Sequence, residues 1–183
     1  MSFSQIDLTA KKCLTPNGYK LFRIINSKLF NIWDKPTSST GKYHKRKDGT
    51  VPTIAEHTHE MVKAASKIIR MFGGPQISTD NDAILLGIIF HDSLKYGSKG
   101  TNPHTTRNHD QQAADLFEKN KKLFLKHFTE DEFETFCLCI RFHSGIWSAD
   151  AKKENMTVDD FIPEVLFVHI LDMLSTVSCL NEG

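Results

Sequence analysis

The sequence has little net charge, no long apolar run and no recognisable signal peptide. Lys and Arg together number 23 and Asp and Glu number 22, which gives a formal net charge of +1. So small a net charge argues against extensive binding of duplex nucleic acid. No apolar run reaches the roughly 18 residues that a membrane-spanning helix needs, and the N-terminus lacks a charged start followed by an apolar core. We therefore predict a cytoplasmic protein that has no membrane partner.

Cysteines are also few, and their spacing forms neither a CxxC pair nor a disulfide framework. The four are Cys13, Cys137, Cys139 and Cys179. Cys137 and Cys139 lie two positions apart, so on a helix they would point to different faces, which argues against a zinc knuckle. We interpret the cysteines as buried free thiols in a reducing compartment.

Alternation with a period of two, which is typical of half-buried strands, is nearly absent. Apolar residues instead recur three or four positions apart, and 183 residues are enough for one domain with a substantial core. We therefore predict an all-α fold, a compact bundle of about six to eight helices. The expected helices cover residues 21–33, 53–72, 79–90, 108–119, 129–140 and 163–180.

Local signals mark helix ends and a division along the chain. Thr53 with Glu56, and Thr129 with Glu132, have the spacing of a capping box. Residues 79–90 are apolar all round, so periodicity does not separate helix from strand, but their capped start and length favour a buried central helix. We expect residues 1–52 to form a helical extension and a basic loop, packed in one compact unit on a core of residues 53–183.

The chain contains nine histidines, and helical position separates those expected inside from those expected outside. His57 shares an apolar stripe with Met61, so it should point inward, whereas His59 falls among charged residues and should face solvent. His109 and His143 also lie on the apolar side of their helices.

Two acids accompany these inward histidines. His91 and Asp92 end the apolar segment, and Asp172 lies in an otherwise almost entirely apolar helix. Because a buried unpaired carboxylate is costly, Asp172 needs a cation, a metal or a polar network. A single inward histidine is usually a hydrogen-bonded core residue, but four of them with two acids indicate a divalent metal site inside a helical bundle.

The order of these residues resembles the H…HD…D signature of the HD-domain phosphohydrolases. The likeness spans residues 53–175 and includes the local sequence at each position: Ala55-Glu56-His57-Thr58, Phe90-His91-Asp92-Ser93-Leu94-Lys95-Tyr96 and Leu171-Asp172. His109 and His143 match the additional histidines of family members with two metals, whose pattern is H…HD…H…H…D. The chain lacks the GYP motif of the family's cyclic-dinucleotide enzymes.

The resemblance implies a compact helical core of the HD-domain type that holds one or two divalent ions. The first ion would be bound by His57, His91, Asp92 and Asp172. Asp92 would also bridge to a second ion, which His109 and His143 would complete. Iron, manganese, cobalt or nickel suit so imidazole-rich a site, with zinc and magnesium as alternatives.

The resemblance also implies an enzyme: a phosphomonoesterase, a phosphodiesterase or a nucleoside polyphosphate hydrolase. In-line attack by hydroxide formed on the metal would cleave a phosphate ester or anhydride of a nucleotide or related small phosphorylated substrate. Asp92 and Lys95 would be catalytic, and Lys95 would also contact the phosphate. Lys99 and Arg107, in the loop before His109, are further candidates for phosphate contact.

The run from Lys42 to Lys47 is the one strongly basic cluster in the sequence. It is either a solvated loop or part of the pocket mouth, where it would attract a polyphosphate or an oligonucleotide. Two other functions therefore stay open: a phosphodiesterase or exonuclease on short single-stranded RNA or DNA, and a noncatalytic nucleotide-sensing module. The oligomeric state is also open, a homodimer included.

Three further histidines have less definite positions. His104 lies in the loop before His109 and is an alternative ligand for the second metal. His169 precedes Asp172 by one helical turn, so it either hydrogen-bonds that carboxylate or packs in the core. His127 lies in a lysine-rich segment and is expected at the surface.

Overall fold

The computed structural model describes residues 3–29, 31–39, 45–46, 48–72 and 79–176. Over these ranges the chain is helical, apart from its loops and an isolated β-bridge between Pro36 and Thr53. The α-helices are α1 (Phe3–Cys13), α2 (Pro16–Lys28), α3 (Ile54–Met71), α4 (Thr79–Phe90), α5 (His109–Lys119), α6 (Lys121–Phe124), α7 (Glu130–Arg141), α8 (Ala149–Glu154) and α9 (Pro163–Thr176). Short 3-10 turns form η1 (Gly145–Trp147) and η2 (Val158–Asp160). The predicted all-α fold is confirmed.

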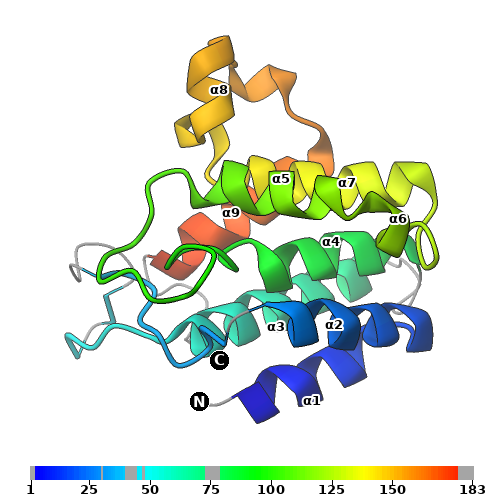
Figure 1. Cartoon of the computed structure of the whole chain (residues 1–183), viewed down its shortest axis with the longest axis horizontal. Helices are drawn as coiled ribbons and strands as arrows, with labels where there is room; N and C mark the ends of the chain where they lie inside the picture. The colour runs from blue at the N-terminus through cyan, green and yellow to red at the C-terminus, as the bar shows by residue number, and fades with distance from the viewer. Residues whose placement is uncertain (1–2, 30, 40–44, 47, 73–78, 177–183) are drawn as a thin grey trace.

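Helix α4 occupies the centre of the bundle, between the α5–α7 pair and the α2–α3 pair (Figure 1), and it also contacts α9. Every residue from Leu85 to Phe90 is buried, as the apolar sequence of this stretch predicts. Gly87 permits a close approach of α7, because a Cβ at this position would lie 2.8 Å from the Cβ of Cys139. The central helix therefore ends in the interior, where His91 and Asp92 follow it.

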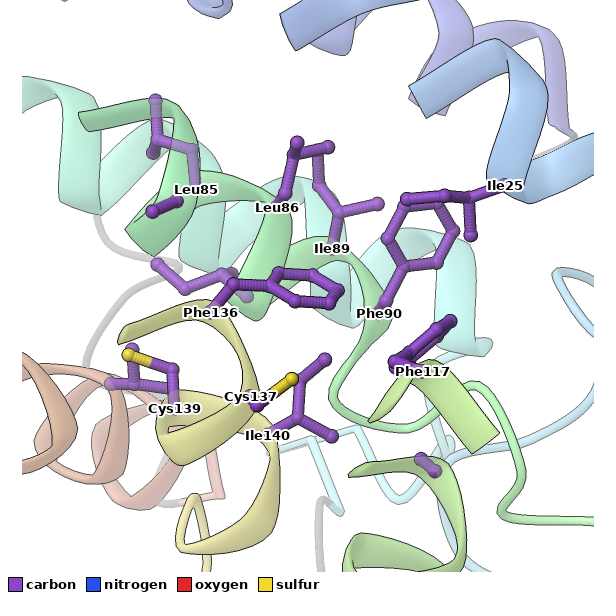
Figure 2. Packing of buried hydrophobic residues seen from close by; sticks show 14 of the residues in the cluster. Ile25, Leu85, Leu86, Ile89, Phe90, Phe117, Phe136, Cys137, Cys139 and Ile140 are labelled. Carbon is purple, nitrogen blue, oxygen red and sulfur yellow. The ribbon is translucent and has the colours of Figure 1, made fainter. Parts of the chain in front are cut away.

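Aromatic rings fill the space around the end of α4 (Figure 2). Phe90 lies with its ring centroid 6.1 Å from that of Phe117, which in turn lies 5.2 Å from that of Phe136. Cys137 and Cys139 are buried free thiols in this core, and burial raises the pKa of Cys137 to about 12. Cys13 is half-buried, and Cys179 lies outside the described residues. The interpretation as buried thiols thus holds for Cys137 and Cys139.

The N-terminal helices differ from the prediction. Helix α1, which packs on α3, falls in the expected helical extension but outside the helix ranges that the apolar pattern gives, and α2 ends at Lys28 although that pattern extends to Trp33. Beyond α2 the chain is held by tertiary contacts: the Trp33 indole is buried and donates to Asn26 Oδ1 at 2.9 Å. Beyond Lys28, the apolar residues Ile32 and Trp33 are buried without being part of a helix. The division at residue 52 stays a prediction.

Two capping boxes fix the starts of α3 and α7. In each box, the threonine hydroxyl accepts a hydrogen bond from the main-chain N–H of the glutamate three residues later, and the glutamate carboxylate accepts one from the threonine N–H. The pairs are Thr53 with Glu56 and Thr129 with Glu132, as predicted.

Within the described residues, no helix is both long and apolar enough to cross a membrane.

A buried carboxylate joins α2 to α4. Asp82, in the first turn of α4, accepts hydrogen bonds from the main-chain N–H of Thr15 at 2.9 Å and from the Thr15 hydroxyl. The same hydroxyl accepts from the N–H of Gly18, which caps α2. Gly18 has to lack a side chain, because a Cβ there would overlap the Asp82 carboxylate.

Replacing Asp82 with alanine should lower the free energy of unfolding by about 2 kcal/mol, because it leaves the N–H and hydroxyl of Thr15 without their buried acceptor. Urea unfolding of wild type and Asp82→Ala measures the difference. Asp159→Asn, at an exposed site, is the control and should have little effect. Equal stabilities of Asp82→Ala and wild type would show that this connection contributes nothing.

Candidate metal centre

Six side chains from five parts of the chain converge at one end of α4. His57 lies in the first turn of α3, His109 begins α5, and His91 and Asp92 directly follow α4. His143 comes just after α7 and Asp172 lies within α9. We call His57, His91, Asp92, His109, His143 and Asp172 the six-residue cluster. Four of its members are at most 2% exposed, and the side chains of the other two are only 13% (His109) and 15% (Asp172) exposed.

The first half of the cluster surrounds His57 and His91. Their Nε2 atoms are 3.2 Å apart. Asp172 Oδ1 lies 3.2 Å from the Nε2 of His57 and 4.0 Å from that of His91. Asp92 Oδ2 lies 3.5 Å from His91 Nε2. Nitrogen and oxygen atoms thus face a common centre.

The second half of the cluster shares Asp92 with the first. The Nε2 atoms of His109 and His143 are 3.3 Å apart, and Asp92 Oδ1 lies 3.0 Å from the first and 3.8 Å from the second. Three sets of three residues each offer ligand atoms that lie within 4.8 Å of one another: His57, His91 and Asp92; His91, His143 and Asp172; and Asp92, His109 and His143. Asp92 therefore stands where one carboxylate could serve two adjacent sites.

Main-chain carbonyls fix the orientation of the histidine rings. Nδ1 lies 2.7–2.9 Å from a carbonyl oxygen in three of them: His91 with Ile88, His109 with Thr106 and His143 with Ile140. A carbonyl oxygen only accepts, so each Nδ1 carries a hydrogen and each ring turns its Nε2 toward the centre.

Ser175 gives His57 the same orientation. Its hydroxyl donates to the main-chain carbonyl of Asp172 at 2.6 Å, and its oxygen lies 3.0 Å from His57 Nδ1. The serine oxygen therefore accepts from Nδ1–H, and His57 also turns its Nε2 toward the centre. Partners of this kind behind the ligands are typical of metal-binding histidines.

The donor atoms fit a divalent cation. Asp92 Oδ1 and Asp172 Oδ1 are buried and receive no hydrogen bond within the described residues, although ring nitrogens lie close to both. Unprotonated imidazole nitrogens at 3.2–3.3 Å from each other repel unless a positive charge lies among them. Imidazole and carboxylate are ligands for several divalent transition metals. The cluster could therefore hold a metal ion.

The pKa values keep the cluster in its ligand form. Burial lowers the pKa of His91 and lowers that of His143 to about 3, so both rings are neutral at pH 7. Burial alone would raise the pKa of Asp92, but Lys95 and the neighbouring histidines hold it well below its usual range. For Asp172, His57, His91 and His143 likewise outweigh burial and lower the pKa.

Of the three predicted phosphate-binding residues, Lys95 alone lies at the cluster. Its Nζ lies 2.6 Å from Asp92 Oδ2. Lys99 and Arg107 are exposed and are not among the residues that line the adjoining cavity, and their phosphate contact stays a prediction. Both residues belong to the loop between α4 and α5, in which the Thr106 N–H donates to the Lys95 carbonyl at 2.7 Å.

A cavity of about 590 Å³ leads from the surface to the cluster. Its wall contains residues that sequence reasoning missed: Thr37, Ser38, Thr105, Ser144, Trp147, Lys152, Met173 and Thr176. Thr37 and Ser38 reach the site because the Thr37 N–H donates to the Pro52 carbonyl at 2.9 Å, beside the bridge of Pro36 to Thr53. Such a contact leaves no local sequence signal. Trp147, four residues after His143, could have been found by its proximity to a predicted ligand.

The other histidines within the described ranges lie away from the cluster or behind it, and His44 lies outside those ranges. His59 points away from the cluster, as expected, but it is half-buried against α1 rather than fully exposed, with Nδ1 2.8 Å from Thr9 Oγ1. His104 is exposed and does not line the cavity. His169 Nδ1 donates to the His143 carbonyl at 2.8 Å rather than to Asp172. His127 is half-buried, and its Nδ1 lies 2.7 Å from Asn17 Oδ1.

Most of the basic run from Lys42 to Lys47 lies outside the described residues. Within its described part, Lys45 is exposed, and Arg46 forms ion pairs with Glu60 at 3.1 Å and Glu56 at 3.5 Å. These carboxylates compensate the charge of Arg46.

Comparison of the chain with protein-family models, with curated proteins and with solved structures gave no match.

Asp92→Ala or His91→Ala should abolish tight metal binding, because Asp92 belongs to both halves of the cluster and His91 lies at the centre of the first. His109→Ala should remove at most one ion per chain. Metal content by mass spectrometry after manganese or iron loading and desalting distinguishes these outcomes. His59→Ala, on the same helix as His57, is the control and should retain the wild-type content. Equal metal loss in His59→Ala would contradict the site.

The metal-free protein should lose stability as pH falls below about 6.5. Burial lowers the pKa of His91 and His143 in the folded state, the latter to about 3. Unfolding restores the ordinary pKa of about 6.5, so the unfolded chain binds more protons in this interval and acid favours it. Urea unfolding with a chelator at about pH 7.5, 6 and 5 should give decreasing free energies.

His143→Gln should weaken this pH dependence, whereas His104→Gln, at an exposed position, should retain it. A free energy of unfolding that stays constant over the interval would mean that the folded state accommodates the extra protons.

Proposed function

We propose that the chain is a metal-dependent phosphohydrolase that cleaves a phosphate ester or anhydride of a nucleotide or related small phosphorylated molecule. One observation carries the proposal: four imidazoles, two carboxylates and a lysine meet at a cavity that opens to solvent. Metal-assisted hydrolysis needs this combination of ligands, positive charge and substrate space.

The six-residue cluster would hold one or two divalent ions, with Asp92 shared between them. When bound, such an ion supplies Lewis acidity toward water and toward a phosphoryl oxygen. Iron, manganese, cobalt or nickel would suit the imidazole-rich donor set, with zinc and magnesium as alternatives. The resemblance of the six residues to the H…HD…H…H…D pattern of HD-domain phosphohydrolases supports the same reaction class.

The chain's own residues would bind and orient the phosphate. Lys95 is half-buried, lines the cavity and contacts Asp92, so it would hold that carboxylate in place and offer its remaining N–H groups to a phosphate oxygen. Ser144 and Thr105 line the cavity, and their hydroxyl groups would donate to other phosphate oxygens. Fixed donors around a reacting phosphoryl group stabilise its charge in the transition state.

The function is tested by assaying the metal-loaded protein on mononucleotides, dinucleoside polyphosphates and short single-stranded oligonucleotides side by side. We expect hydrolysis of one of the first two classes. Lys95→Met should lower kcat/KM about 100-fold, the typical effect of removing one transition-state donor, while metal content stays at the wild-type level.

Lys99→Met is the matched control, since Lys99 is exposed and outside the cavity wall, and its activity should equal that of wild type. Cleavage of oligonucleotides alone would instead identify a single-strand phosphodiesterase. Absence of hydrolysis across the panel with manganese, iron and cobalt would favour a noncatalytic nucleotide-sensing module.

A further inference from the structure

An indole ring stands exposed on the wall of the cavity. Trp147 is 55% exposed, although tryptophan is a costly residue to leave in water, and it lines the same cavity as His109, His143 and Asp172. The other tryptophan of the chain, Trp33, is 5% exposed and donates to Asn26. Packing in the core therefore accounts for Trp33 but not for Trp147.

The position of Trp147 is fixed relative to the metal centre. Trp147 ends η1, which begins at Gly145, two residues after His143. Gly145 has a φ of +58°, and a Cβ there would lie 2.7 Å from the ring of His169. The His169 ring in turn lies 5.7 Å from the indole, centroid to centroid, and is hydrogen-bonded to the His143 carbonyl. The indole is thus supported by the segment that carries a candidate ligand.

The residues that line the cavity include a charged group and an apolar group. Lys95 and the six-residue cluster provide the charged part. Trp147 and Met173, both substantially exposed, provide the apolar part. Lys152, in α8, adds an exposed ammonium that forms no ion pair within the described residues. The cavity volume of about 590 Å³ is that of a small-molecule site.

The geometry points to Trp147 as the platform that recognises the base of a nucleoside phosphate bound in this cavity. The phosphate would lie at the cluster beside Lys95, and the base would stack on the indole, with Met173 beside it. Stacking uses the flat face of any base, so it selects nucleotides over phosphate esters without an aromatic group. The phosphate end of this arrangement rests on the proposed function, whereas the base end can be tested by binding alone.

The test compares three probes: AMP, adenosine and ribose 5-phosphate, which has the sugar and phosphate of AMP but no base. AMP and adenosine should quench the tryptophan fluorescence of the wild type, and ribose 5-phosphate should not. Calorimetry should show that Trp147→Ala weakens AMP binding about tenfold, as expected for loss of one base–aromatic contact, and leaves ribose 5-phosphate unchanged. Trp147→Phe, which keeps an aromatic ring, should restore most of the AMP affinity.

Ile170→Ala is the matched control, because Ile170 is 54% exposed on α9 but does not line the cavity. It should bind all three probes like wild type. The inference is overturned if AMP and adenosine leave the fluorescence unchanged in both metal-free and manganese-loaded protein, or if Trp147→Ala weakens AMP and ribose 5-phosphate equally. It is also overturned if Trp147→Ala dissociates a dimer without changing AMP affinity, since the indole would then be a subunit contact.

The experiment can reject the base platform and the phosphohydrolase function independently of each other. Quenching by AMP without hydrolysis of any phosphate ester would retain the base platform and reject the phosphohydrolase. Hydrolysis of AMP and ribose 5-phosphate with equal kcat/KM would retain the phosphohydrolase and reject the platform.

Discussion

Imidazole lone pairs and carboxylate oxygens are costly to bury against one another unless a positive charge lies among them. The six-residue cluster meets this condition only in part, because Lys95 contacts one oxygen of Asp92, whereas the other receives no hydrogen bond from the part of the chain that the structure describes. The Nδ1 atoms of the histidines are already engaged on the far side of each ring. The six-residue cluster is therefore arranged so that it could hold a metal ion.

The rest of the fold holds this arrangement in place. The doublet of His91 and Asp92 can lie in the interior because α4 is surrounded by helices and ends there. At Gly87, α7 packs closely against α4 through Cys139, and His143 follows two residues after the end of α7. Capping boxes at Thr53 and Thr129 begin α3 and α7 at fixed points. Hydrophobic packing and helix capping thus position polar groups that would otherwise repel one another.

Charged and apolar side chains line one cavity. The cluster and Lys95 supply ligands and charge, while Trp147 and the residues beside it supply an apolar surface. His169 connects the two, since its ring lies against the indole and its Nδ1 donates to the carbonyl of His143. A nucleoside phosphate has the same division into an anionic end and an aromatic end. This correspondence is why the proposed substrate and the proposed base platform support each other.

The sequence by itself determined the all-helical fold, the capped helix starts and the burial of residues such as His57 and His143. These features are local, because capping and the spacing of apolar residues act within one helix. Only the tertiary structure decided that His59 is half-buried against α1, that Arg107 lies outside the cavity wall and that Trp147 lies on it. Those positions depend on contacts between segments distant in the chain, about which the periodicity of a single helix carries no information.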